Sequence, residues 1–268
     1  MSKRSKLLFY WEPYSLSVEQ YDDNRTIIKS ASTLLTEEKT PTMAFEELNS
    51  YLDGGVIEET SLLIRQTTVM LQQYTIPHLK GKEKNNYLEA KVRKDWEGSD
   101  PFYWSHVNLK SEANAKDSIQ TFAMSRHFID AFIKYSKQIN ALPLKAFTTQ
   151  ALAVNRSSLV SQSNDKSILL FDDENSILLV MVDDNKPVLL REMSISAIMD
   201  RADEFDRLSK EIQRTWLYAK QQYKFFPTKL ILSGSELYSH RQTLSSLIDE
   251  VIVEEDMVQD WKESLFES

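Results

Sequence analysis

Three short apolar segments in quick succession constrain the fold of this chain more than any other feature. They cover residues 167–171, 177–182 and 188–193, and clusters of Asp, Glu and Asn separate them. Such clusters are typical of tight turns between antiparallel strands. Apolar residues then recur at spacings of three and four over 198–223, which predicts a long helix packed on a sheet. A buried strand follows at 229–232, so this half of the chain is expected to form one lobe of mixed α/β structure.

The first half of the chain repeats this order of elements without repeating the sequence. Apolar and polar residues alternate over 7–21 and again over 26–32, with turn-forming residues between the two segments,. A further strand is expected near 51–57. The segment 126–140 carries one apolar helical face, and a strand with a short helix is expected over 144–156. The first half of the chain is therefore predicted to form another lobe of the same kind, and the Ser-rich stretch at 157–165 is the expected boundary between the two lobes.

Between these elements the chain carries a smaller unit, expected at about 62–115. Residues 62–76 are rich in β-branched side chains, residues 81–96 place Leu88, Val92 and Trp96 on one helical stripe, and residues 101–109 are strand-like,. We therefore expect a small β-α-β insert. The predicted domains are a first lobe over 1–163, which contains this insert, and a reduced second lobe over 164–268.

Composition excludes several classes of protein. The 268 residues include no cysteine, which excludes disulfide frameworks and thiolate metal sites,. The net charge is −8, and no Lys/Arg-rich run is seen beyond the short amino-terminal group Lys3, Arg4 and Lys6, so nucleic acid is not an expected partner,. No stretch approaches the roughly 18 consecutive apolar residues of a membrane span. We therefore expect no direct insertion into a membrane.

Two lobes that each open with an antiparallel meander resemble the actin-like ATPase superfamily, which has a ribonuclease H-like fold. Within it, the chain is similar to the PilM/GspL-type proteins of type IV pilus and type II secretion assembly platforms. The resemblance covers nearly the whole chain. The matching stretches are Ile76-Pro77, the Ala-x-x-x-x-Arg segment at 151–156, Lys186-Pro187, Arg191 and the helix segment 211–218.

The positions that hold ATP in this superfamily are altered here. The first Asp-x-Gly turn of the family corresponds to residues 9–14. Here Glu12 adds a negative charge, and Pro13 lacks the backbone amide that could donate to a phosphate. The second such motif corresponds to residues 171–177 and places Asp173 where the family has glycine. A shift by one residue restores its aspartate as Asp172 but still supplies no glycine.

The adenosine-binding positions are altered as well. Gly234, with Ser235 beside it, is all that corresponds to the family's Gly-Gly pair. The glycine pair after the meander is replaced by residues 194–197, and the family's Glu-x-x-Lys has no counterpart. We therefore expect a pseudo-ATPase with no catalytic residue and no bound cofactor, in which Glu12, Asp172 and Asp173 repel a triphosphate. The alternative is an active ATP-binding actin-like ATPase or kinase whose site is hidden by sequence drift.

The acidic cluster at 172–175 has a second interpretation, since clustered carboxylates also bind calcium or magnesium,. The cluster lacks the regular ligand spacing and the glycine of such loops, and Asp and Asn are common in tight turns. We favour a turn and expect no metal site.

The resemblance implies a non-catalytic scaffold, located in the cytoplasm and peripheral to the inner membrane through its partners. Those partners would be the cytoplasmic tail of a PilN-like membrane protein and the pilus or secretion assembly ATPase. In the family the tail lies in a groove between the first lobe and its insert, which makes Val69 and Leu71 candidates for binding. Trp261, on a terminal helix expected over 256–266, is a third candidate,. The sequence leaves open whether the chain forms a homodimer.

Overall fold

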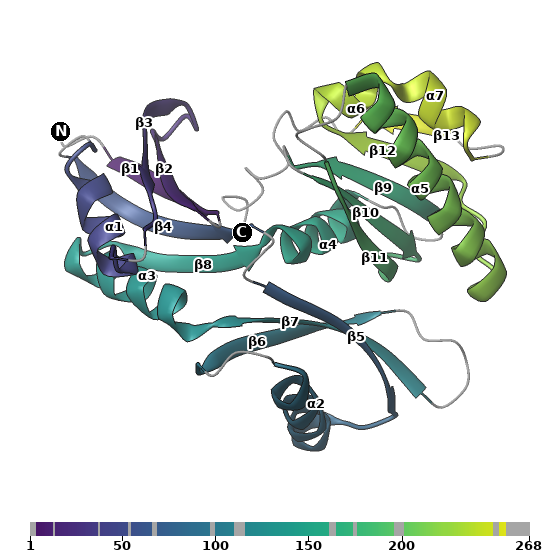
Figure 1. Cartoon of the computed structure of the whole chain (residues 1–268), viewed down its shortest axis with the longest axis horizontal. Coiled ribbons are helices and arrows are strands. Elements are labelled where there is room, and N and C mark those ends of the chain that lie inside the picture. The colour runs from purple at the N-terminus through teal and green to yellow at the C-terminus, as the bar shows by residue number, and fades with distance from the viewer. Residues whose placement is uncertain are drawn as a thin grey trace. The chain divides into compact units, whose positions relative to one another are not determined.

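The structure is a computed structural model of the chain, shown in Figure 1. It describes residues 4–12, 14–36, 38–52, 55–65, 69–96, 100–109, 116–160, 165–173, 176–195, 201–248 and 252–255. The chain forms two compact units. The first contains Met1–Gln73, Leu79–His106 and Thr121–Thr149, and the second contains Tyr74–His78, Val107–Gln120 and Gln150–Ser268. The boundary predicted at residues 163 and 164 lies outside the described residues.

A five-stranded sheet in the order β3-β2-β1-β4-β8 forms the centre of the first unit (Figure 1). The first three strands pair antiparallel, β4 lies parallel to β1, and β8 lies parallel to β4. The strands are β1 (Arg4–Trp11), β2 (Ser15–Tyr21), β3 (Ile27–Leu34), β4 (Val56–Ile64) and β8 (Leu142–Thr148). This arrangement places the β1–β2 turn beside the carboxyl end of β4.

Helices α1 (Pro41–Asn49) and α3 (Arg126–Gln138) pack on this sheet through aromatic side chains. The ring of Phe9 on β1 lies 5.0 Å from that of Phe45 on α1 and 5.5 Å from that of Tyr135 on α3. Edge-to-face contacts of this kind stabilise a core beyond the burial of their area. The helical face predicted over 126–140 is confirmed by α3.

Two predictions for the first unit need correction. Helix α1 was not predicted, although Thr40 and Pro41 form a helix-start signal, and the Thr40 hydroxyl accepts a hydrogen bond from the amide of Met43 at 3.3 Å,. The strand expected near 51–57 begins only at Val56 and continues to Ile64. The reason is the turn-forming sequence Asp-Gly-Gly directly before Val56, which disfavours an extended strand there,.

The insert has one more strand than predicted. It contains β5 (Val69–Pro77), α2 (Gly81–Asp95), β6 (Phe102–Leu109) and β7 (Lys116–Ser125). The three strands form a sheet in the order β5-β7-β6. The sequence also predicts a strand over 118–124 that resumes the main lobe after the insert. This strand is β7, which lies between the other two strands of the insert sheet, so the insert is β-α-β-β. Leu88 and Val92 of α2 are buried, as the helical stripe predicted.

The second unit has a five-stranded sheet in the order β11-β10-β9-β12-β13. The meander of β9, β10 and β11 is antiparallel, and β12 and β13 continue the sheet in parallel, so the strand order matches that of the first unit. The strands are β9 (Lys166–Asp172), β10 (Ser176–Asp183), β11 (Lys186–Ser194), β12 (Lys229–Ser233) and β13 (Ile252–Glu255). The predicted pairing of the meander, and of the strand at 229–232 with it, is confirmed.

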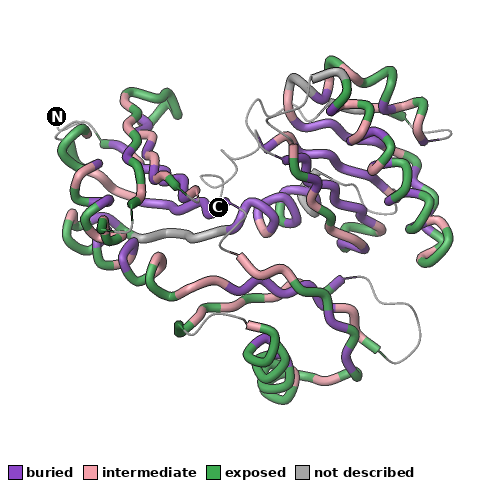
Figure 2. The backbone as a smooth tube through the Cα atoms, viewed as in Figure 1, coloured by how far each residue is buried: buried purple, intermediate pink, exposed green. Residues whose placement is uncertain are grey.

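Helix α5 (Arg201–Gln222) packs on the core of the second unit through an apolar stripe. Its residues Leu208, Ile212 and Trp216 are buried in that core. Figure 2 shows the strands of this sheet as mostly buried and α5 as partly exposed. Helix α4 (Thr149–Val160) follows β8, as predicted. None of the described helices combines the length and the apolar character that a membrane crossing requires.

The end of the second unit differs from prediction. The single helix expected over 237–247 is two short helices, α6 (Ser235–Ser239) and α7 (Arg241–Ser246). They separate at His240, whose backbone leaves the helical region and whose ring stacks on Phe205 at 3.8 Å. The helix expected over 256–266 lies outside the described residues.

Candidate functional site

The β1–β2 turn is closed by the residues on both sides of it. The amide of Glu12 donates to the carbonyl of Ser15 at 2.9 Å, and the Ser15 hydroxyl donates to the Glu12 carboxylate at 2.9 Å. Pro13 lies outside the described residues. A phosphate-binding turn would present this amide to its ligand. Here the amide of Glu12 already donates its hydrogen bond within the turn.

Arg65, directly after β4, neutralises this turn. Its amide donates to the carbonyl of Trp11 at 2.9 Å, and its guanidinium forms an ion pair with Glu12. The Arg65 side chain is 8% exposed, and its guanidinium carbon lies 5.4 Å from the centre of the Tyr10 ring. Glu12 is therefore not an uncompensated negative charge, and the expectation that it repels a triphosphate stays a prediction. The sequence signal was a basic residue at the end of the apolar run 62–64.

The β9–β10 turn has the same hydrogen-bonding pattern but different charge chemistry. The amide of Asp173 donates to the carbonyl of Ser176 at 2.9 Å, and the amide of Ser176 donates back at 3.3 Å. Asp173 therefore corresponds to Glu12, and Ser176 to Ser15. Asp173 is 3% exposed. The predicted turn is confirmed, while the remainder of the acidic cluster, at 174 and 175, lies outside the described residues.

A second carboxyl group, that of Glu192 on β11, lies beside this turn and interacts with Asp173 and Ser176. It accepts a hydrogen bond from the side-chain amide of Gln150, at the start of α4, at 2.7 Å. Burial raises the pKa of Glu192 above its ordinary value of 4.5, and the charge of Asp173 raises it further, although hydrogen bonds from Gln150 and Ser176 act in the opposite direction,. Neither Gln150 nor Glu192 was a predicted site residue, because only the folded chain brings them to Asp173.

Gly234 lies against the other acidic residue of the turn. Its φ is +119°, a conformation that side chains rarely allow, and an added Cβ would lie 2.8 Å from the Cβ of Asp172,. Glycine is therefore required here for two independent reasons. Ser235 is the first residue of α6. The structure thus brings the predicted positions Asp172 and Gly234 together.

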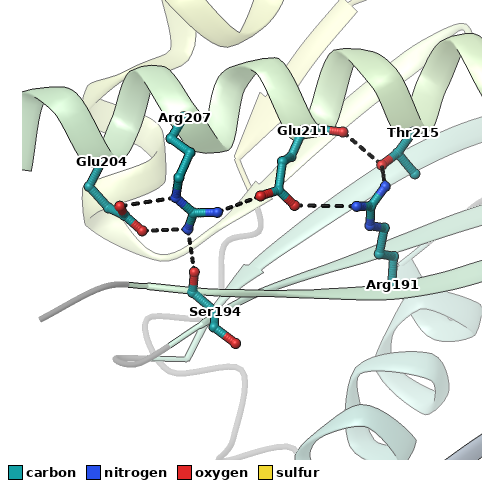
Figure 3. Close-up of polar contacts among 6 residues, drawn as sticks. All are labelled: Arg191, Ser194, Glu204, Arg207, Glu211 and Thr215. Carbon is teal, nitrogen blue, oxygen red and sulfur yellow. Dashed lines mark hydrogen bonds and ion pairs between the residues drawn. The ribbon is translucent and has the colours of Figure 1, made fainter. Parts of the chain in front are cut away.

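The stretches that carry the resemblance, Arg191 and the segment 211–218, meet in a polar network between β11 and α5 (Figure 3). Arg191 donates to Thr215 at 2.6 Å and to Glu211 at 3.3 Å. Arg207 donates to the carbonyl of Ser194, to Glu211 and, at 2.5 and 3.1 Å, to Glu204. Because Glu204 is buried, this network holds the long helix on the edge strand of the sheet,.

The candidate partner-binding residues are only partly described. Val69 and Leu71 are both half-buried on β5, and Val69 packs against the first core. Neither is deeply buried, so the expectation that one of them takes part in binding stays a prediction. Trp261 lies outside the described residues.

The two units, each an antiparallel meander continued by parallel strands, define the actin-like ATPase fold. The chain superposes with a TM-score of 0.65 on a chain of the PilM-PilN type IV pilus biogenesis complex, at 13% identity, covering 94% of this chain and 88% of that one. A Bacteroides thetaiotaomicron protein with an actin-like ATPase fold and unknown function gives a TM-score of 0.55 at 14% identity, covering 94% and 91%.

The cytoplasmic domain of EpsL, an inner membrane component of the type II secretion system of Vibrio cholerae, gives a TM-score of 0.47 at 9% identity, covering 96% and 87%. The sequence matches no protein-family model and no curated protein. At these identities the likenesses show the fold alone.

Proposed function

We propose that this chain is a PilM/GspL-type, non-catalytic cytoplasmic scaffold of a pilus or secretion assembly platform. It would bind the cytoplasmic tail of a PilN-like inner-membrane protein and couple that protein to the assembly ATPase. The proposal has two parts, the absence of useful ATP binding and the capture of a tail, and each has its own support.

The β9–β10 turn is the observation that carries the first part. A triphosphate brings about four negative charges, and proteins that bind it offer free amides, lysine and magnesium. This turn offers a buried Asp173 beside Glu192, and the amide of Asp173 is already bonded to Ser176. At an effective dielectric near 20, a like charge at about 4 Å from a phosphate costs on the order of 4 kcal/mol.

The first-unit turn supports the same conclusion through a different mechanism. Glu12 repels a phosphate less than its charge suggests, because Arg65 neutralises it. Among the described residues, Arg65 is the buried cation beside this turn, and its Nη1 atom is bound to Glu12, so a phosphate that took this nitrogen from Glu12 would have to break the pair. Breaking a largely buried pair costs about 3 kcal/mol.

The second part rests on the fold likeness to a chain of the PilM-PilN complex. A peptide that binds beside a small sheet needs an exposed strand edge or an apolar pocket. β5 lies at an edge of the three-stranded insert sheet, and Val69 and Leu71 are accessible enough to contribute apolar contacts.

Tail capture can be tested with labelled peptides from the cytoplasmic tails of PilN-like membrane proteins, using fluorescence anisotropy. We expect Val69→Asp or Leu71→Asp to weaken binding at least tenfold, because a charge placed in an apolar contact is desolvated without a counter-ion. Gln72→Asp is the matched control and should leave binding unchanged, because this exposed position of the same strand lies on the opposite face from Val69 and Leu71,. Failure of every tail to bind at 100 μM, or equal effects of all three substitutions, would contradict this part of the proposal.

The alternative, an active ATPase or kinase, is favoured by one observation, the retained Gly234 in its positive-φ conformation. Protection of the protein by Mg-ATP against thermal unfolding would support this alternative, while unchanged unfolding in the presence of Mg-ATP would support the scaffold.

A further inference from the structure

The edge strand β3 leaves hydrogen-bonding groups exposed in the first unit. It pairs with β2 on one side, and among the described residues no strand pairs with its other side. Edge strands of this kind pair readily with further strands unless charge, proline or a covering element prevents it. β3 contains no proline, and its only charged residue is Lys29.

The register with β2 identifies which backbone groups point outward. The amide of Leu35 donates to the carbonyl of Tyr14, and the pairing continues as Thr33 with Leu16 and Ala31 with Val18. In an antiparallel pair, hydrogen-bonded and non-hydrogen-bonded residues alternate. The amides and carbonyls of the alternate residues therefore face away from β2. These outward residues are Ser30, Ser32 and Leu34.

The side chains of the same residues are also exposed. Ile28, Ser30, Ser32 and Leu34 are all exposed, with Ile28 at 37% and Leu34 at 70%, whereas the residues between them are half-buried or buried. Alternation of this kind follows from the two-residue repeat of a strand. One side of β3 thus presents small polar residues at its centre and an apolar residue at each end.

This pattern is nearly palindromic about Ala31. Reading outward from it gives Ser30 and Ser32, then Lys29 and Thr33, then Ile28 and Leu34. Two antiparallel copies of β3 centred on Ala31 would pair serine with serine. They would also bring Ile28, at the irregularity in the pairing of β3 with β2, beside Leu34. Lys29 would face Thr33 rather than another lysine, so the pairing creates no like-charge contact.

From this self-complementarity we propose that β3 pairs with β3 of a second copy of this chain, antiparallel about a two-fold axis at Ala31. The two five-stranded sheets then form one continuous ten-stranded sheet across the dimer. A two-fold interface requires one surface to complement itself, which the palindromic strand does and an arbitrary edge does not. An unrelated peptide adding to this edge would impose no such symmetry on β3.

The dimer should be weak. A pair of seven-residue strands buries less area than a standard protein interface, so we expect a dissociation constant of about 10 μM or weaker. This inference is independent of the proposed scaffold function, since it depends only on the edge of the first sheet.

The register can be tested by sedimentation velocity on the full chain from 1 to 200 μM. In the proposed pairing, residue 30 of one copy faces residue 32 of the other. Ser30→Lys combined with Ser32→Glu therefore creates two opposite-charge pairs across the axis and should retain the dimer. Ser30→Lys combined with Ser32→Lys creates two like-charge pairs and should raise the dissociation constant at least tenfold.

These two double variants form a matched pair, because they share the lysine at position 30 and differ only at position 32. Both positions are exposed, and the Cα partners of residues 30 and 32 in β2 are Glu19 and Ser17, so neither variant places a like charge directly opposite on β2. The second variant also sets two lysines two residues apart on one face of β3, and the melting curves measure the effect of that repulsion within one copy. Ser32→Pro removes one outward amide without breaking the ladder to β2 and should also abolish the dimer. Equal circular dichroism melting curves confirm that the variants are folded.

A wild-type chain that stays monomeric up to 200 μM would overturn the proposal. So would a dimer that the two double variants affect equally, since the contact would then lie elsewhere or have another register. A dimer that survives Ser32→Pro would exclude backbone pairing at this edge.

Discussion

The β1–β2 turn of the first unit and the β9–β10 turn of the second occupy the same position in sheets of the same strand order, but their charge chemistry is opposite. In each turn an acidic residue donates its amide to the carbonyl of a serine three residues later. In the first turn the acid, Glu12, meets the guanidinium of Arg65. In the second, the acid Asp173 meets the carboxyl group of Glu192.

The difference shows how a repeated framework can be stabilised in two ways. The first turn is closed by a charge pair between neighbouring strand ends. The second turn is closed by packing, with Gly234 against Asp172, and it tolerates two nearby carboxyl groups through the hydrogen bond from Gln150 and the raised pKa of Glu192. The following substitutions test whether the two turns depend on these different interactions.

The largest effect is expected from Arg65→Met. It removes a largely buried guanidinium and leaves Glu12 without its counter-ion, so we expect the free energy of unfolding to fall by about 3 kcal/mol,. Urea denaturation monitored by tryptophan fluorescence measures the change. Combining Arg65→Met with Glu12→Gln should recover part of the loss, because no unpaired carboxylate remains. Equal losses in the single and double variants would show that the ion pair is unimportant.

Gly234→Ala tests the packing of the second turn. A side chain at φ +119° is strained, and its Cβ would lie 2.8 Å from that of Asp172, so we expect a loss of about 2 kcal/mol in the same assay,. Gly81→Ala is the matched control, because Gly81 has a φ of +51° but nothing within 4 Å of an added Cβ. It should cost about 1 kcal/mol. Equal costs at the two positions would mean that the contact with Asp172 does not matter.

Glu192→Gln should have the smallest effect and the opposite sign. Because the pKa of Glu192 is raised in the folded protein, the unfolded chain loses this proton first as the pH rises above 4.5. The folded state is then destabilised relative to the unfolded state, so the contribution of Glu192 to the free energy of unfolding falls with rising pH. Replacement by Gln should remove this dependence and stabilise the protein at pH 7 by about 1 kcal/mol.

Denaturation midpoints at pH 4 and pH 7 provide the measurement for Glu192→Gln. Destabilisation at pH 7 would mean that the carboxylate is favourably solvated and that the second turn is not an acid–acid contact.

The sequence predicts the framework of these turns better than their chemistry. The second meander is predicted closely, because its apolar runs end at Asp and Asn residues that only a turn accommodates well,. The closing residues of both turns are not predictable in this way. Arg65 is 53 residues from Glu12, and Gln150 is 42 residues from Glu192, so only the pairing of the strands brings them together. The insert was predicted with one strand too few because the order β5-β7-β6 depends on non-local pairing.

Calorimetric titration with Mg-ATP tests the central claim most directly, namely that the altered turns of this actin-like fold do not bind ATP usefully. At millimolar nucleotide we expect no saturable heat, either for the native chain or for Asp173→Gly, since restoring one glycine leaves the Glu12–Arg65 pair in place. Saturable binding to the native chain with a dissociation constant below about 10 μM, near 7 kcal/mol of binding free energy, would contradict the claim.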